Sequence, residues 1–273
     1  MIFYVIGYNP GREYKAFEGS PMDALMLGCA GAFLAFMLAA GKGRLPRYFS
    51  FAGCLLLFAS LGMRWYMLGR PPWATLYETA AILALVTGIA AAYWYMKGET
   101  RALYTPLAAI TVLITAFSAA SWKDGMAISP ALDSGWLLIH VPLAILSYGM
   151  FAISCVASIA LIALCILNGK DEQALKKLDS VSHACIAVGL ALLMAGIIMG
   201  ALWAKAAWGS YWSWDPKETW SLITAAIYAA YLIVRKTGIS AEDAAFLSLL
   251  GFMAMLFTYL GVSYIIPGLH SYA

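Results

Sequence analysis

Two histidines and one aromatic segment are the residues of this chain whose types and spacing point to a shared site. The segment WGSYWSWDPKETW, residues 208–220, contains four tryptophans, a tyrosine and a charged turn. His140 lies in GWLLIHVPLAILSYG and His270 in GVSYIIPGLHSYA, both in apolar surroundings. Imidazoles are common axial ligands of haem iron, and flat indole rings suit a large planar ligand. These residues together predict a haem site.

The aromatic segment predicts an ordered shelf at the membrane surface. Its rings, together with that of the nearby Trp203, are those of Trp208, Tyr211, Trp212, Trp214 and Trp220. An interfacial belt of indoles is the ordinary alternative, and it accounts for one or two of them. Asp215, Pro216 and Glu218 then fit an N-cap, a first helical position and a reciprocal capping residue. A turn capped in this way is expected to be rigid.

Each charged or titratable candidate also has a structural interpretation. A hydrogen-bonded structural histidine is the alternative for His140 and for His270, and their shared placement beside the aromatic loop favours ligation. Arg64 and Arg70 could clamp a haem propionate. We favour an ordinary ion pair with Glu78 or Asp215 for these two arginines.

The elements that must position these residues are membrane-spanning helices. Hydrophobic residues make up 63% of the 273 residues and charged residues only 11%, far below the charge of soluble domains. In lipid, each spanning segment must satisfy its own backbone hydrogen bonds. We therefore predict an all-α integral membrane protein of about eight transmembrane helices, near 23–41, 48–68, 77–96, 103–120, 136–168, 180–204, 219–235 and 243–265.

Basic residues predict the orientation and the organisation of the chain. Ten of them lie on one side of the predicted spans and seven on the other, which places both termini and the aromatic loop on the outer face. The expected divisions are an external tail (1–22), four helices (23–120) and a haem-handling core (121–273) with its loop at 203–220. The net charge of +3 is scattered, so no nucleic-acid partner is expected. The five cysteines form no C-x-x-C pair and are predicted to be small core residues.

The motifs resemble those of the CcsA (ResC) cytochrome c biogenesis family of system II. WAKAAWGSYWSWDPKETWSLI matches the WWD signature of that haem-handling superfamily closely, and the segments around His140, His270 and RWYMLGRPPWATLYE are also similar. The resemblance covers about residues 50–273. It implies that His140 and His270 ligate haem iron on the outer face. It also implies that Trp208, Trp212, Trp214 and Asp215 hold the porphyrin.

The resemblance further implies partners and a location. These are haem b as the transferred ligand, the membrane subunit CcsB (ResB), and an apocytochrome c whose thiols form the bonds. The expected location is the bacterial cytoplasmic membrane, with several passes through the lipid bilayer and with functional loops facing the periplasm or the cell exterior. The chain would be a subunit of a haem lyase complex; whether it is itself an enzyme is left open. A HemX-like regulator of tetrapyrrole synthesis is the alternative, and selective loss of c-type cytochromes in a deletion strain would distinguish the two.

One position departs from the family pattern. Ile233, in YLIVR, stands where members commonly carry a transmembrane histidine. His183 is predicted to begin the sixth helix at the same inner level, so we consider it as a replacement metal ligand. Its favoured interpretation is a capping or packing residue at a helix start.

Overall fold

The computed structural model describes residues 29–31, 33–34, 36, 45–98, 101–121, 134–167 and 171–266, and the regular elements within them are helices. The chain forms two compact units, Met1–Leu138 and Ile139–Ala273. His270 and most of the first predicted span lie outside the described residues. The predicted all-helical fold class is confirmed for the part of the chain that is described.

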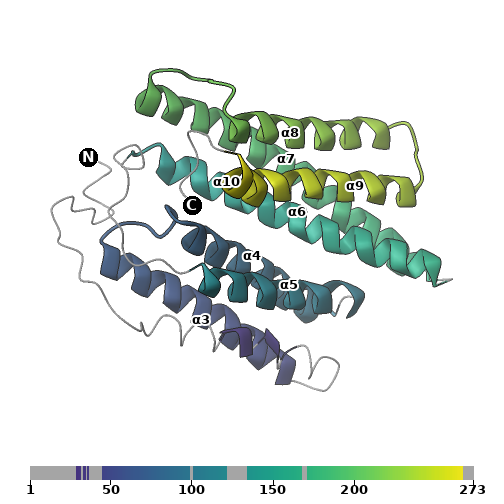
Figure 1. Ribbon diagram of the computed structural model, residues 1–273. Coiled ribbons are helices and arrows are strands. Elements are labelled where there is room, and N and C mark those ends of the chain that lie inside the picture. The colour runs from purple at the N-terminus through teal and green to yellow at the C-terminus, as the bar shows by residue number, and fades with distance from the viewer. Residues whose placement is uncertain are drawn as a thin grey trace. The chain divides into compact units, whose positions relative to one another are not determined.

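The first unit contains α3 (Leu45–Leu68), α4 (Leu76–Met96) and α5 (Arg101–Ala120). Helix α3 packs on α4, and α4 packs on α5 (Figure 1). Phe33 is fully buried, and a Cβ at Gly53 or Gly88 would lie 2.6 or 2.7 Å from its ring. The absence of a side chain at these two glycines therefore makes room for the ring.

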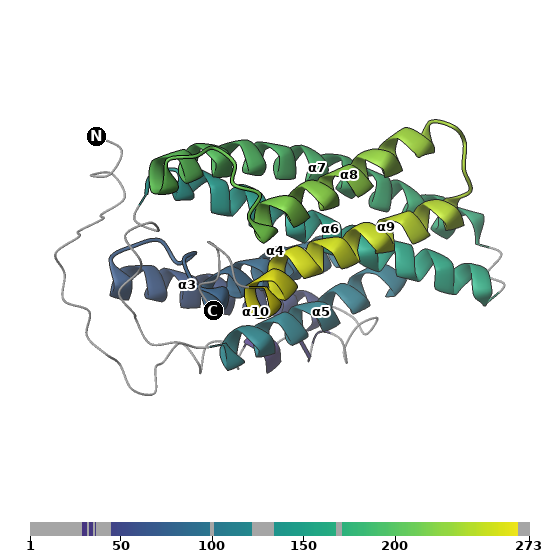
Figure 2. The same cartoon turned by 45° about the horizontal axis from the view of Figure 1, so that its top comes forward.

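The second unit is built from the rest of the chain, although α6 begins two residues before it. Its elements are α6 (Leu137–Ile166), α7 (Glu172–Trp208), α8 (Pro216–Arg235), α9 (Ala241–Leu256), a π-helix η2 (Phe257–Gly261) and α10 (Val262–Ile265). Helix α8 packs on α7 and on α9, and the last three elements follow one another as one helical stretch (Figure 2).

Six of the described helices are long and apolar enough to cross a membrane. They are α3, α4, α5, α6, α7 and the α9–η2 stretch, so the chain is a multi-pass membrane protein. The predicted seventh span is present as α8, which carries Lys217, Glu218 and Arg235 near its ends and is not among these six helices. Apart from the first and sixth spans, the predicted ends agree with the helices within three residues.

The predicted start of the sixth helix is wrong. Helix α7 runs for 37 residues from Glu172, capped by the Asp171 side chain, which accepts a hydrogen bond from Ala174 N. The polar residues after Asp171 continue the helix beyond the apolar stretch, because hydropathy marks the lipid-compatible part of a helix and not its hydrogen-bonded extent. His183 therefore lies about three turns inside α7 and not at its start.

The centre of the second unit is a pair of stacked rings. Phe151 of α6 and Tyr228 of α8 have ring centroids 3.9 Å apart and planes 13° apart. A Cβ at Gly189 of α7 would lie 2.6 Å from the Phe151 ring, and one at Gly251 of α9 would lie 2.7 Å from the Tyr228 ring. The two rings are thus enclosed by glycine backbone on the neighbouring helices.

Four buried serines join three helices of the same unit. Ser154 Oγ lies 2.8 Å from Ser182 Oγ and 2.9 Å from Ser248 Oγ, and Ser158 Oγ lies 3.0 Å from Ser182 Oγ. Small hydroxyl side chains that satisfy one another are a common means of association between membrane helices, since they let backbones approach closely.

We predict that Gly251→Ala destabilises the protein by about 1–3 kcal/mol, because the added methyl group would collide with the buried Tyr228 ring. The Tm in detergent measures this effect. Gly62→Ala in α3 is the matched control, since nothing lies within 4 Å of a Cβ there. Equal Tm values for the two variants would contradict the glycine–ring packing.

Candidate functional site

His140 is half-buried near the start of α6 and lies against α7. Its Nδ1 atom is 2.7 Å from the carbonyl oxygen of Gly196. The imidazole is nearly parallel to the Trp203 ring, at 11° and 6.3 Å between centroids. A Cβ at Gly200 would lie 2.8 Å from His140 Cε1. One face of α7 therefore holds the imidazole in place.

The predicted aromatic rings make several edge-on and tilted contacts among the described residues. Trp203 is 2% exposed and meets Trp208 edge-on, with centroids 5.1 Å apart and planes at 73°. Trp212 and Trp214 meet at right angles, 5.8 Å apart. Trp220 packs on Phe257, the first residue of the π-helix, at 4.4 Å. His140, Trp203 and Trp208 thus form one continuous group at the end of α7.

The loop between α7 and α8 has a defined backbone. Gly209 ends α7 in the left-handed region, with φ +82°. Trp214 also has a positive φ, +59°, which is uncommon for a bulky residue and persists only where neighbouring contacts enforce it. The Trp214 side chain is 70% exposed and that of Tyr211 is 56% exposed. The loop therefore presents aromatic rings outward from a constrained backbone.

The predicted capping of α8 is confirmed. Asp215 is the N-cap, Pro216 begins the helix, and Glu218 completes a capping box. The Asp215 carboxylate accepts from Lys217 N at 2.9 Å, and Glu218 Oε2 accepts from Asp215 N at 3.2 Å. Lys217 precedes the predicted span 219–235, and burial of its ammonium group lowers its pKa against the opposing attraction of Asp215.

Glu218 has a second role that the sequence did not indicate. Its Oε2 atom also accepts hydrogen bonds from Ser213 N at 2.8 Å and from Ser213 Oγ at 3.2 Å. Thr219 Oγ1 donates to the Trp214 carbonyl at 3.3 Å. The first turn of α8 thus ties down the two residues before its own cap. A capping glutamate gives no sequence signal for such extra partners.

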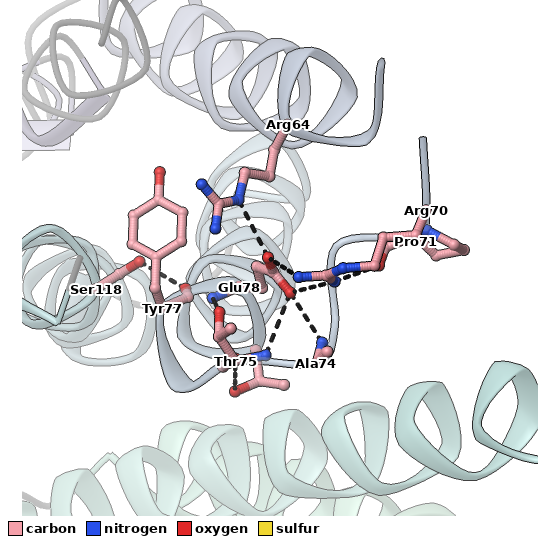
Figure 3. A network of polar contacts seen from close by, with 9 residues as sticks. Arg64, Arg70, Pro71, Ala74, Thr75, Tyr77, Glu78 and Ser118 are labelled. Carbon is pink, nitrogen blue, oxygen red and sulfur yellow. Dashed lines mark hydrogen bonds and ion pairs between the residues drawn. The ribbon is translucent and has the colours of Figure 1, made fainter. Parts of the chain in front are cut away.

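Arg64 and Arg70 converge on Glu78 in the first unit (Figure 3). Arg64 Nε donates to Glu78 Oε1 at 3.1 Å, and Arg70 donates to both carboxylate oxygens at 3.0 and 3.1 Å. The N–H groups of Ala74 and Thr75 donate to Oε2 as well. The ion pair with Glu78 that the sequence favoured is confirmed, whereas the propionate contact stays a prediction.

His183 lies inside α7 with its ring 6.0 Å from that of Tyr231. Its Nδ1 atom is buried and has no hydrogen-bond partner among the described residues. Nearby on the same two helices, Arg235 Nη2 donates to Asp179 Oδ2 at 2.7 Å. The capping part of the His183 interpretation is therefore wrong, because Asp171 caps this helix twelve residues earlier in the chain. Its proposed ligand role stays a prediction.

The fold and the site define a class: a multi-pass helical membrane protein that presents a histidine and an ordered aromatic loop. The family model "Cytochrome C assembly protein" matches residues 73–270. The chain belongs to this cytochrome c assembly family.

Relatives agree with this assignment. Cytochrome c biogenesis protein CcsA of Guillardia theta is 35% identical over 247 residues, covering 80% of this chain and 82% of that protein. CcsA of Chlamydomonas reinhardtii is 36% identical over 244 residues, covering 84% and 68%. The solved structure of the cytochrome c haem lyase CcmF has a TM-score of 0.68 and 19% identity. The match covers 91% of this chain but only 48% of CcmF, and it indicates a shared fold.

We predict that Glu78→Gln lowers the stability of the first unit strongly, by about 3–5 kcal/mol, because it removes a buried carboxylate charge that pairs with two buried guanidinium groups. The Tm in detergent and the amount of folded protein in the membrane are the measurements. Glu172→Gln is the control, since its ion pair with Lys176 is solvent-exposed and should contribute little. A Glu78→Gln protein as stable as that control would show that the cluster does not support the fold.

Proposed function

We propose that this chain is the membrane haem-handling subunit of a system II cytochrome c synthase. It binds haem b at the outer face of the membrane, with His140 and His270 as axial ligands, and presents it to apocytochrome c. The membership of the cytochrome c assembly family supports the process. The CcsA relatives, matched over most of their length, support the particular role.

One observation carries the proposal: His140 is held against Trp203, which contacts Trp208 at the beginning of the aromatic loop. An imidazole nitrogen is a suitable donor for haem iron, and the indoles beside it offer flat apolar surface for a porphyrin. The residues present therefore fit haem as a cargo. The constrained loop keeps these rings in place before haem arrives, which lowers the entropic cost of binding.

The chain's own residues hold and orient haem and do not form the covalent bonds. The sequence has no C-x-x-C motif, so the two cysteines of the apocytochrome C-x-x-C-H motif would add across the haem vinyl groups, each thiol proton passing to a vinyl carbon. Exchange of one protein histidine for the histidine of that motif would release the product. Catalysis of this kind depends mainly on positioning. We propose CcsB as the partner that recognises the apocytochrome.

We also propose that Arg64 and Arg70, which converge on Glu78, contact a haem propionate. Two guanidinium groups share the Glu78 carboxylate, and the side chains of all three residues are at most 5% exposed. Carboxylates such as haem propionates match the geometry of a guanidinium group.

We predict that the purified wild-type protein, co-expressed with its partner, has the visible spectrum of low-spin haem. His140→Ala and His270→Ala should each lose or shift that spectrum in the oxidised and reduced forms, because each removes one axial ligand. Ile139→Ala is the matched control, since this neighbour on α6 is 49% exposed and should leave the spectrum unchanged. An unaltered spectrum in both histidine variants would place the ligands elsewhere.

We also propose that His183 supplies an inner ligand in place of the histidine absent at Ile233. Its buried Nδ1 atom supports this, because a buried ring nitrogen without a partner is costly unless it is used. We predict that His183→Ala lowers haem content and cytochrome c maturation, whereas Val188→Ala, at a half-exposed position of the same helix, does not. Full haem occupancy and full maturation in His183→Ala would rule out this role.

A further inference from the structure

We infer that Gly196 and Gly200 of α7 are positioning residues that fix the tautomer of His140 and direct its Nε2 atom to the haem iron. This inference rests on the proposed function, because it concerns how the proposed ligand is held. It adds the identity of the ligating nitrogen and the element that selects it.

The tautomer follows from the hydrogen bond between His140 and Gly196. The two atoms are 2.7 Å apart, His140 Nδ1 and the carbonyl oxygen of Gly196. A carbonyl oxygen can only accept, so Nδ1 must carry the proton. In a neutral imidazole the lone pair then lies on Nε2, which is the nitrogen able to ligate a metal.

The absence of a side chain at Gly200 lets the ring reach this position. A Cβ at Gly200 would lie 2.8 Å from His140 Cε1 and 2.9 Å from Nδ1, but 3.6 Å from Nε2. The edge of the ring that carries Nδ1 and Cε1 therefore rests on the backbone of α7. Nε2 is the ring nitrogen farther from that backbone.

Trp203 restricts rotation of the same ring. Gly196, Gly200 and Trp203 are spaced by four and three residues, so they share one face of α7. Trp203 is 2% exposed and nearly parallel to the imidazole. On this face Gly196 supplies the hydrogen-bond acceptor, Gly200 leaves room for the imidazole, and Trp203 supplies a parallel ring. Together these three residues determine the orientation of the ligand.

The two glycines act through different atoms, which makes them separable. A Cβ at Gly196 would meet Ala144 N at 3.5 Å and Leu143 Cβ at 3.6 Å, both ordinary contacts. Gly196→Ala therefore keeps the carbonyl acceptor and fits the structure. Gly200→Ala also adds one methyl group to the same face of the same helix, but this group would displace the imidazole.

A hydrogen bond from Nδ1–H to a carbonyl makes Nε2 a stronger donor to iron. Groups that orient ligating histidines in this way typically change metal affinity by about 10–100-fold. Loss of the bond should therefore weaken haem retention and shift the reduction potential of the bound haem. Both quantities report on the iron and not merely on folding.

Chemical rescue of His140→Gly tests the hydrogen bond. Imidazole can ligate iron and donate its N–H to Gly196, whereas 1-methylimidazole ligates iron but has no N–H to donate. The concentration of each ligand that restores the low-spin spectrum is divided by the concentration at which that ligand binds free haem in detergent. We expect this ratio to be about 10–100-fold higher for 1-methylimidazole than for imidazole. Equal effectiveness would overturn the inference while leaving ligation by His140 intact. An unchanged spectrum in His140→Gly without added ligand would instead contradict the proposed function.

A comparison of two glycine variants tests the positioning role of Gly200 without an added ligand. We expect Gly200→Ala to lose low-spin haem or to shift its reduction potential, and Gly62→Ala in α3, where nothing lies within 4 Å of an added Cβ, to keep both as in the wild type. The Tm of each variant in detergent serves as a check that both fold. Equal spectra and potentials in two folded variants would overturn the positioning role, even if His140→Ala abolishes haem binding.

Discussion

Close contact between aromatic rings and glycine backbone is the interaction on which both units depend. Phe33 rests on two glycines of the first unit, and Tyr228 rests on Gly251 in the second. Apolar helices gain no hydrophobic driving force from one another in lipid, so close van der Waals packing must hold them together. The imidazole of His140 on Gly200 uses the same arrangement. The proposed ligand is therefore held by the kind of contact that holds the core.

Two helix starts organise the polar parts of the protein. The capping carboxylates of α4 and α8, Glu78 and Glu218, each lie three residues after an N-cap. Each also accepts hydrogen bonds beyond the cap, Glu78 from two arginines and Glu218 from Ser213. A carboxylate offers about four acceptor sites, so one side chain can satisfy a helix end and fix the segment before it. The aromatic loop and the arginine cluster both depend on this capacity.

Much of the fold and part of the site could be predicted from local sequence. Apolar runs of about 20 residues predicted most helices, because the bilayer sets the length of a spanning segment. Asp215, Pro216 and Glu218 predicted the cap of α8, because a capping box depends on residue types three positions apart. Hydropathy failed at the start of α7, where polar residues extend the helix beyond its apolar part.

The sequence by itself determined the helical class, the family, and the types of residue that serve the site. Only the tertiary structure decided which of them meet. The partner of His140 is a carbonyl 56 residues away, and Arg64 shares a carboxylate 14 residues away. Every residue has a backbone carbonyl, so residue type does not show which carbonyl accepts a hydrogen bond. The packing role of a glycine depends on which ring lies against it in the folded protein. Helix packing sets those distances. The orientation of the proposed ligand therefore depends on contacts between residues of α6 and α7 that are far apart in the sequence.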